Sequence, residues 1–229
     1  METNEYKILI VDDEDDILEF VSYNLRKEGY QVLTANNGRD AIKIAKDKLP
    51  HLIILDVMMP EVDGIETCRE LRQTSSLDSS IITFFTARNE DYSQIAGFEA
   101  GADDYISKPI KPRLLTSKVN ALLRRHVETS KNTSAYSLGS LIIDPEKYIV
   151  KFKGTEYSLP RKEFELLSLL TSKPNNVFTR DQIFSRIWSN EVIVGDRTID
   201  VHIRKLREKL GADNIKTIKG VGYKYEFKE

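Results

Sequence analysis

The sequence predicts an α/β unit with a parallel sheet, followed by a smaller α+β unit. Up to residue 125, short apolar runs alternate with helical patterns. A polar stretch without periodicity follows, and the remaining residues combine short strand patterns with three helical ones. A chain of 229 residues is long enough for one or two such domains.

Five apolar runs are the expected strands of the first unit. They are hydrophobic almost throughout, which is typical of strands covered on both faces of a sheet. Their ranges are 7–11, 31–35, 52–55, 81–85 and 104–107. The spacing of apolar residues predicts helices over 15–29, 38–49, 64–73, 92–100 and 112–125. This alternation predicts a doubly wound, five-stranded parallel sheet.

The second unit is separated from the first by the polar segment HVETSKNTSAYS. Its Ser/Thr-rich composition predicts a short flexible linker. The expected organisation is therefore a first domain over 1–125, a linker over 126–137 and a second domain over 138–229. In the second domain we expect strands over 140–144, 148–152 and 155–159, helices over 161–172, 180–188 and 197–210, and a terminal hairpin over 216–227 that turns at Gly220–Gly222.

Charge and composition narrow the class of protein. Residues 1–125 hold 16 Lys+Arg and 22 Asp+Glu, whereas residues 126–229 hold 18 and 14, so an acidic half precedes a basic one. An acidic half can hold a cation, and a basic half can meet phosphates. The single cysteine, Cys68, excludes an internal disulfide framework. With no apolar run long enough for a membrane span, we expect a cytoplasmic protein without membrane contact.

Polar side chains follow the predicted parallel strands at the edge where a ligand crevice forms. Asp12 and Asp13 end the first strand, Asp56 the third, Thr86 the fourth and Lys108 the fifth. Like-charged carboxylates close together repel, and an oxygen-only set of ligands suits Mg²⁺. Each of these residues taken alone is also consistent with a helix cap or a solvated surface charge. Their convergence on one edge favours a functional site.

Four motifs carry a resemblance to a known family. IVDDE, LDVMMPEVDG, FFTA and GADDYISKP resemble, in order and spacing, the signatures of response-regulator receiver domains over residues 5–125. The resemblance implies a flavodoxin-like fold with strand order 2-1-3-4-5. It also implies that Asp56 accepts a phosphoryl group from a sensor histidine kinase, or from a small donor such as acetyl phosphate.

The resemblance assigns roles to the residues around Asp56. Asp13 would bind Mg²⁺ directly, Asp12 through water, and Met58 through its backbone carbonyl. Lys108 would pair with a phosphoryl oxygen, and the Thr86 hydroxyl would donate to another. In this family a cis peptide precedes the position of Pro109.

The same resemblance implies a switch and a homodimer. The phosphoryl group would draw Thr86 inward, and Tyr105 would follow from an exposed to a buried position. A half-buried strand aromatic is the alternative for Tyr105. Asp103, Asp104, Lys118 and Arg125 stand where the family forms a network of charge pairs across its dimer face. Leu114, Asn120 and Gln94 depart from that network, and exposed pairs contribute only ~0–1 kcal/mol each.

The third helical pattern of the second unit suits DNA. At ~100° per residue, apolar residues gather on one face. The opposite face carries Arg197, Val201, Arg204 and Lys205. Cationic side chains can bind guanine edges or phosphates, and Val201 could meet a thymine methyl group. A solvated face of a surface helix is the alternative reading of this stripe.

A second resemblance covers residues 138–227. LPRKEFELLSLL, TRDQIFSRIW, DRTIDVHIRKLREKLG and IKGVGYKYEF resemble the winged helix-turn-helix domain of the OmpR/PhoB subfamily. The resemblance implies a recognition helix in the major groove, phosphate contacts near Thr198 and a wing that carries Lys219 to the minor groove. Double-stranded DNA with tandem half-sites is the expected ligand. Residues 189–195 stand where some members contact RNA polymerase, although their apolar run also suits a core.

The sequence thus predicts a phosphorylation-activated transcription regulator of a two-component system. It predicts no enzyme activity beyond Mg²⁺-dependent self-phosphorylation and autodephosphorylation. A hydrolase that uses Asp56 as a covalent nucleophile would need an acid/base partner at position 58, which is Met. A constitutive DNA-binding protein with a purely structural first domain is the remaining alternative.

Overall fold

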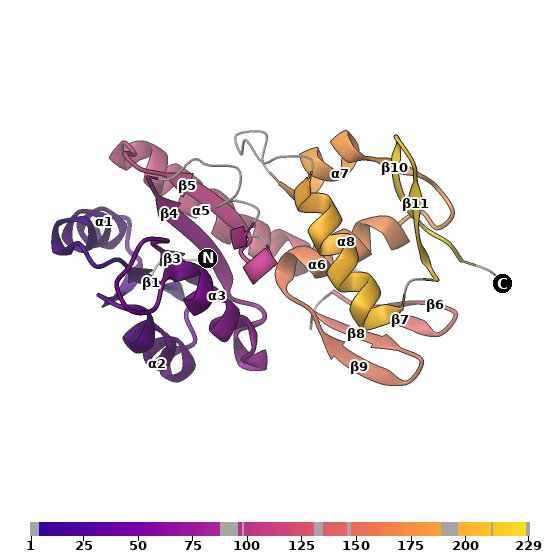
Figure 1. The fold of residues 1–229 in the computed structure, drawn as a ribbon, viewed down its shortest axis with the longest axis horizontal. Coiled ribbons are helices and arrows are strands. Elements are labelled where there is room, and N and C mark those ends of the chain that lie inside the picture. The colour runs from indigo at the N-terminus through magenta and orange to yellow at the C-terminus, as the bar shows by residue number, and fades with distance from the viewer. Residues whose placement is uncertain are drawn as a thin grey trace. The chain divides into compact units, whose positions relative to one another are not determined.

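The computed structural model describes residues 5–87, 96–97, 99–130, 135–145, 148–188, 197–211 and 213–227, without the side chains of 124–130 and 197. The chain forms two compact units, Met1–Val127 and Glu128–Glu229, each described by itself (Figure 1). Within the described residues, no helix is both long and apolar enough to cross a membrane.

The first unit is built on a parallel sheet. Its strands lie in the order β2-β1-β3-β4-β5, which confirms the predicted order. They are β1 (Lys7–Val11), β2 (Gln31–Ala35), β3 (Leu52–Leu55), β4 (Ile81–Thr86) and β5 (Asp104–Ser107). β1 and β3 occupy the middle and are almost fully buried, because helices cover both faces of the sheet.

The helices of this unit divide between the two faces. One core contains Leu25 and Leu115 from α1 (Asp15–Lys27) and α5 (Pro112–Ser130), packed on residues such as Ile10 and Ile54. The other contains residues of α2 (Gly38–Lys48) and α3 (Gly64–Arg72), packed on Leu9 and Ile53. A short 3₁₀ helix, η2 (Ser75–Leu77), leads into β4. Of the helix predicted over 92–100, residues 92–95 and 98 lie outside the described residues, and 96–97 and 99–100 are helical.

The segment expected to be a linker begins as a helix. α5 continues to Ser130, five residues beyond the predicted end of the first domain. Adding residues to a packed helix is easy because the costly first turn already exists, so polar residues can extend it. The next described element, β6 (Tyr136–Leu138), also starts inside the expected linker.

The second unit contains two antiparallel sheets. The first has the order β6-β7-β8-β9, with β7 (Leu141–Asp144), β8 (Ile149–Phe152) and β9 (Thr155–Ser158). The second joins β11 (Ile215–Ile218) and β12 (Gly222–Tyr225) in the predicted hairpin. A two-residue strand, β10 (Phe178–Thr179), pairs with β12 and was not predicted, because two residues carry no periodicity.

Three helices complete the described part of the second unit: α6 (Arg161–Thr171), α7 (Arg180–Ile187) and α8 (Arg197–Leu210). Thr179 starts α7 with a capping box, since its hydroxyl accepts from the Gln182 N–H while the Gln182 side chain accepts from the Thr179 N–H. The apolar sides of the helices enclose one core around Phe164, Trp188 and Leu206.

Candidate functional site

The carboxyl edge of the parallel sheet brings together residues from four of its strands. Lys108, just after β5, places its Nζ 2.6 Å from Asp12 Oδ2 and 3.0 Å from Asp56 Oδ1. The Glu14 carboxylate lies farther away, at 3.8 Å from the same Nζ. Thr86 ends β4 beside them and is buried. One ammonium group therefore bridges two buried carboxylates that are 44 positions apart in the chain.

Backbone contacts fix the position of Asp56. Its N–H donates to the Val11 carbonyl at 2.8 Å, and its Oδ2 accepts from the Met58 N–H at 2.8 Å. Gly64, at the start of α3, passes so close that a Cβ there would lie 1.9 Å from the Asp56 carbonyl oxygen. Only glycine fits this position, so the D-G turn of the motif holds α3 against the end of β3.

Burial and charge act against each other at this site. Burial raises the pKa of Asp56 above its ordinary value, although the nearby Lys108 ammonium opposes the change. Burial alone would lower the pKa of Lys108, but its hydrogen bonds and charge interactions with Asp12 and Asp56 outweigh burial and raise it. Lys108 therefore stays protonated, and it partly offsets the negative charge of the two carboxylates.

The metal-ligand residues expected from the sequence are only partly assembled. Asp12 and Asp56 are buried at the edge, whereas Asp13 is exposed. Among the described side chains, no group of three or more Asp, Glu, His or Cys is arranged to hold a metal ion. The Asp12 and Asp56 oxygens are nevertheless the hard ligands that Mg²⁺ prefers. The site fits Mg²⁺ once the Asp13 side chain rotates towards Asp12 and Asp56 and the Lys108 ammonium group moves away from their carboxylates.

Two further expectations concern the end of β5. The Lys108–Pro109 peptide bond is cis, as the resemblance implies. Tyr105 is buried, with 6 % of its surface exposed, and its ring lies 5.7 Å from the Phe84 ring. Its hydroxyl has no hydrogen-bond partner among the described residues, and burial raises its pKa to about 12. The structure thus holds Tyr105 in the inward arrangement, neither exposed nor half-buried.

The predicted dimer face is corrected at Asp103. Its side chain is buried, and its Oδ2 lies 2.6 Å from Arg72 Nη2 within the same unit. The adjacent Asp104 is also mostly buried and accepts a hydrogen bond from the Tyr105 N–H. Asp103 does not lie on the predicted dimer surface, because its carboxylate pairs with Arg72 in the interior of the receiver unit. Lys118 is partly exposed, whereas the Arg125 side chain and Gln94 lie outside the described residues.

Leu114 and Asn120 are the other two residues that differ from the family's charge network, and both are described in the structure. Leu114 is 45 % exposed on α5. Asn120, two residues beyond Lys118 on the same helix, accepts a hydrogen bond from the Tyr30 hydroxyl through its Oδ1. Asn120 therefore joins α5 to the residue just before β2, which is a structural reason for an amide at this position.

On α8 the structure separates the predicted DNA contacts into two groups. Arg204 is exposed and Lys205 is partly exposed, and Lys219 is exposed at the hairpin. Val201 and Thr198, in contrast, are buried at 7 % and 2 % exposure, so Val201 does not face a groove as predicted. The buried side of α8 is therefore wider than the apolar stripe suggests, and both α6 and α7 contact this helix. The Arg197 side chain and residues 189–195 lie outside the described residues.

Sequence reasoning missed a polar cluster next to the hairpin. Arg180 Nη2 lies 2.5 Å from Asp200 Oδ1, and the Tyr223 hydroxyl donates to the same oxygen. The guanidinium also lies over the Tyr223 ring, 5.3 Å from its centre. The cluster joins α7, α8 and β12, and it fixes α8 relative to the hairpin. No signal in the sequence links three residues so far apart.

The fold and the two sites define a class of protein: a receiver domain joined to a DNA-binding, winged helix-turn-helix domain. Residues 8–120 match the family described as response regulator receiver domain, and residues 154–225 match transcriptional regulatory protein, C terminal. The chain belongs to the response regulators of the OmpR/PhoB type and is a transcription regulator of a two-component system.

Relatives match along almost the whole chain. The alkaline phosphatase synthesis transcriptional regulatory protein PhoP of Bacillus subtilis (strain 168) is 40 % identical over 96 % of both chains. The transcriptional regulatory protein ResD of the same organism is 41 % identical over 98 % of both. Among solved structures, a mutant of RitR aligns with a TM-score of 0.77 at 27 % identity, over 97 % of this chain and 100 % of the other. DrrB, a Thermotoga maritima OmpR/PhoB homologue, has 34 % identity and a TM-score of 0.50, over 96 % and 99 %.

Proposed function

We propose that Asp56 accepts a phosphoryl group from a sensor histidine kinase in the cytoplasm. The observation that carries the proposal is the 3.0 Å contact between Lys108 Nζ and Asp56 Oδ1 on a buried edge. A carboxylate oxygen of Asp56 attacks phosphorus, and the bond from phosphorus to the kinase histidine nitrogen breaks as the new O–P bond forms. Such transfer depends mainly on positioning and on offsetting the phosphoryl charge.

Residues around Asp56 supply both requirements. Asp12, Asp13, Asp56 and the Met58 carbonyl would hold Mg²⁺, which supplies positive charge next to the phosphoryl oxygens. Lys108 pairs with one phosphoryl oxygen once it leaves the carboxylates, and the Thr86 hydroxyl donates to another. Position 58 offers no acid/base side chain, so we expect autodephosphorylation but no turnover of other phosphate esters.

The second unit would convert phosphorylation into DNA binding. Arg204 is exposed and Lys205 partly exposed on α8, and they would bind in the major groove, while the exposed Lys219 would bind in the minor groove. A homodimer of phosphorylated chains would place two such helices on tandem half-sites about one helical turn apart. Residues 189–195 are a further candidate contact, with RNA polymerase. This part of the proposal rests on the family resemblance.

The experiment is to incubate the protein with Mg²⁺ and acetyl phosphate and measure its intact mass. We expect the wild type to gain one phosphoryl group and Asp56→Asn to gain none. Asp47→Asn is the matched control, since Asp47 is an exposed aspartate on α2 and should leave the gain unchanged. Phosphorylation of Asp56→Asn would overturn the assignment.

DNA binding tests the link between the two units. The affinity of phosphorylated wild type for promoter DNA should exceed that of the unphosphorylated protein and of Asp56→Asn. Equal affinity in all three states would instead support a constitutive DNA-binding protein whose receiver has only a structural role.

A further inference from the structure

A buried glycine in the helical segment before β5 packs directly on two aromatic rings. Residues 96–97 and 99–100 are helical, and Gly97 is buried. A Cβ atom at Gly97 would lie 2.7 Å from Phe84 Cε2, a separation that real Cβ atoms essentially never show. It would also lie 3.7 Å from Tyr105 Cε2, in van der Waals contact. The missing side chain of Gly97 therefore leaves the space that the two rings occupy.

The Phe84 ring has no free space into which it could withdraw. It is 0 % exposed and belongs to the same core as Tyr105. The two ring centres lie 5.7 Å apart, with the ring planes inclined at 53°. Protein cores are densely packed, so an added methyl group displaces its neighbours. Tyr105, at 6 % exposure, lies at the margin of this core, and it is the ring that can leave.

Hydrogen bonds hold the backbone of Gly97 in place. Its carbonyl accepts from the Gly101 N–H at 3.2 Å and from the Ala102 N–H at 3.1 Å. The next residue, Asp103, donates its N–H to the Ile82 carbonyl of β4 at 2.7 Å. Moving Gly97 away from Phe84 would therefore break bonds to the segment that enters β5. A side chain at position 97 must be accommodated by the rings instead.

Two opposing contributions act on the inward Tyr105. Its buried hydroxyl has no hydrogen-bond partner among the described residues, and leaving such a group unpaired costs free energy. Outward rotation would return the hydroxyl to water. The ring contacts with Phe84 favour the inward arrangement, because aromatic pairs stabilise each other beyond the area they bury. A small change in packing can therefore shift the population between the two arrangements.

We propose that Gly97 is a positioning residue of the switch, because its missing side chain lets Phe84 and Tyr105 pack inward together. A methyl group at position 97 would push Phe84 towards Tyr105 and favour the outward arrangement of Tyr105. Alanine is a better helix former than glycine, so Gly97→Ala should not weaken the helix itself. The inference rests on the proposed function where it links the inward Tyr105 to phosphorylation of Asp56.

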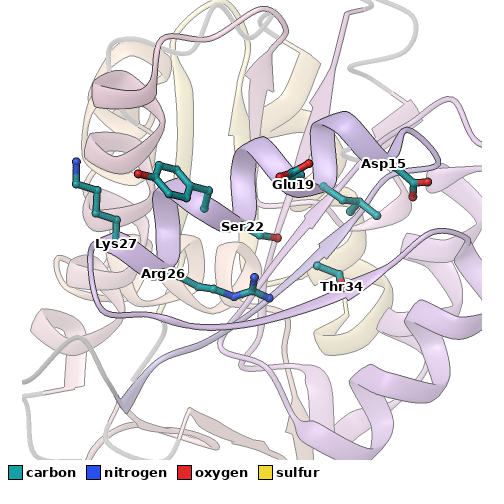
Figure 2. A pocket seen from close by; sticks show the side chains of 8 residues that line it. Asp15, Glu19, Ser22, Arg26, Lys27 and Thr34 are labelled. Carbon is teal, nitrogen blue, oxygen red and sulfur yellow. The ribbon is translucent and has the colours of Figure 1, made fainter.

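The first test measures the exposure of Tyr105 by nitration of the full-length protein with tetranitromethane, followed by peptide mass mapping. Overpacking typically shifts a two-state population about five- to thirtyfold, so Gly97→Ala should raise the Tyr105 nitration rate by about that factor. Tyr23 is the internal standard, since it is 66 % exposed and lines the groove on α1 in Figure 2. An unchanged Tyr105 rate would overturn the proposal.

Two controls distinguish the switch from a general loosening of the receiver. Glu99→Ala changes an exposed residue of the same helical segment and should leave the Tyr105 rate unchanged. Tyr30 is only 5 % exposed and lies in the other core of the receiver unit. If Gly97→Ala raised the nitration of Tyr30 as much as that of Tyr105, the substitution would have loosened the whole unit, and the proposal would be wrong.

A double-substitution cycle tests the contact with Phe84. Phe84→Leu removes the ring atom that a Cβ at position 97 would meet. In this background, Gly97→Ala should change the Tyr105 nitration rate by less than about twofold, because coupled residues show non-additive effects. Equal increases in the two backgrounds would show that the methyl group does not act through Phe84.

DNA binding tests the consequence for the switch. In proteins phosphorylated to the same extent by intact mass, the gain in DNA affinity should be smaller in Gly97→Ala than in the wild type. A full gain together with an exposed Tyr105 would overturn the role of Gly97 in the switch. Failure of the wild type to gain a phosphoryl group would contradict the proposed function alone, because nitration tests Gly97 without phosphorylation.

Discussion

Arg72 and Asp103 form a buried ion pair between the end of α3 and the residue just before β5. Arg72 Nη2 lies 2.6 Å from Asp103 Oδ2, and the two side chains are 6 % and 2 % exposed. The Asp103 Oδ2 also accepts from the Ile82 N–H at 2.8 Å. The same guanidinium donates to the carbonyls of Leu77, Ser80 and Gly101. One arginine thus satisfies four acceptors around the segment that leads into Tyr105.

Removing this arginine should destabilise the receiver unit. Arg72→Met leaves the Asp103 carboxylate buried without its cation, which we expect to lower the free energy of unfolding by about 3–5 kcal/mol. Urea unfolding of the full chain, followed by signals of the receiver, measures the change. Arg69→Met is the control, since Arg69 makes an exposed pair with Glu66 and should cost less than about 1 kcal/mol. Equal effects of the two substitutions would show that the buried pair contributes little.

Removing the bridging lysine should make stability depend on Mg²⁺. In Lys108→Met two buried carboxylates lose the cation between them, and we expect a loss of about 3–5 kcal/mol without metal. Mg²⁺ should restore more stability to this variant than to the wild type, because it would then bind without displacing an ammonium group. Thermal midpoints with and without Mg²⁺ check the prediction. A smaller Mg²⁺ effect in the variant would contradict it.

The two groups of residues on α8 should respond differently to substitution. Arg204→Ala should weaken DNA binding and lower the dependence of log affinity on log salt concentration by about 1, if Arg204 contacts a phosphate. Val201→Ala removes a buried side chain and should instead cost about 2 kcal/mol of stability. Fluorescence binding to promoter DNA over several salt concentrations, beside thermal unfolding, separates the two effects. The prediction would be wrong if Arg204→Ala lowered stability while Val201→Ala left it unchanged.

His51 should make the receiver unit less stable in mild acid. Burial, followed by the charge of Lys7, lowers the pKa of His51 below its ordinary value of 6.5. Its Nδ1 accepts from the Lys7 N–H, and its ring meets Tyr6 edge-on at 5.2 Å. The unfolded chain therefore takes up a proton first, and stability is lost as the pH falls from 6.5 towards the lower, folded pKa.

NMR titration of the three histidines, with His51→Gln to assign the signal, gives the folded pKa directly. The His51→Gln variant should also lose less stability than the wild type between about pH 7.5 and about pH 5.5. A His51 midpoint at or above 6.5 would contradict the prediction.

Local patterns in the sequence were sufficient to predict the strands of the parallel sheet and the polar residues at its carboxyl edge. Continuous apolar runs located all five strands of the receiver unit. Each polar residue of the edge ends a strand or follows it within two positions, so its edge was known as soon as its strand was. The D-G turn before α3 is local in the same sense. The resemblance supplied the strand order, which the structure confirms.

The sequence by itself thus determined which residues reach the carboxyl edge, because a strand and its last residue are neighbours in the chain. Only the tertiary structure decided that Lys108 joins Asp12 across 96 positions, that Arg72 pairs with Asp103 in the interior, and that Val201 is buried. The physical reason is that burial and pairing of a side chain depend on packing against distant segments. Helical or strand periodicity describes one segment at a time and carries no record of its neighbours.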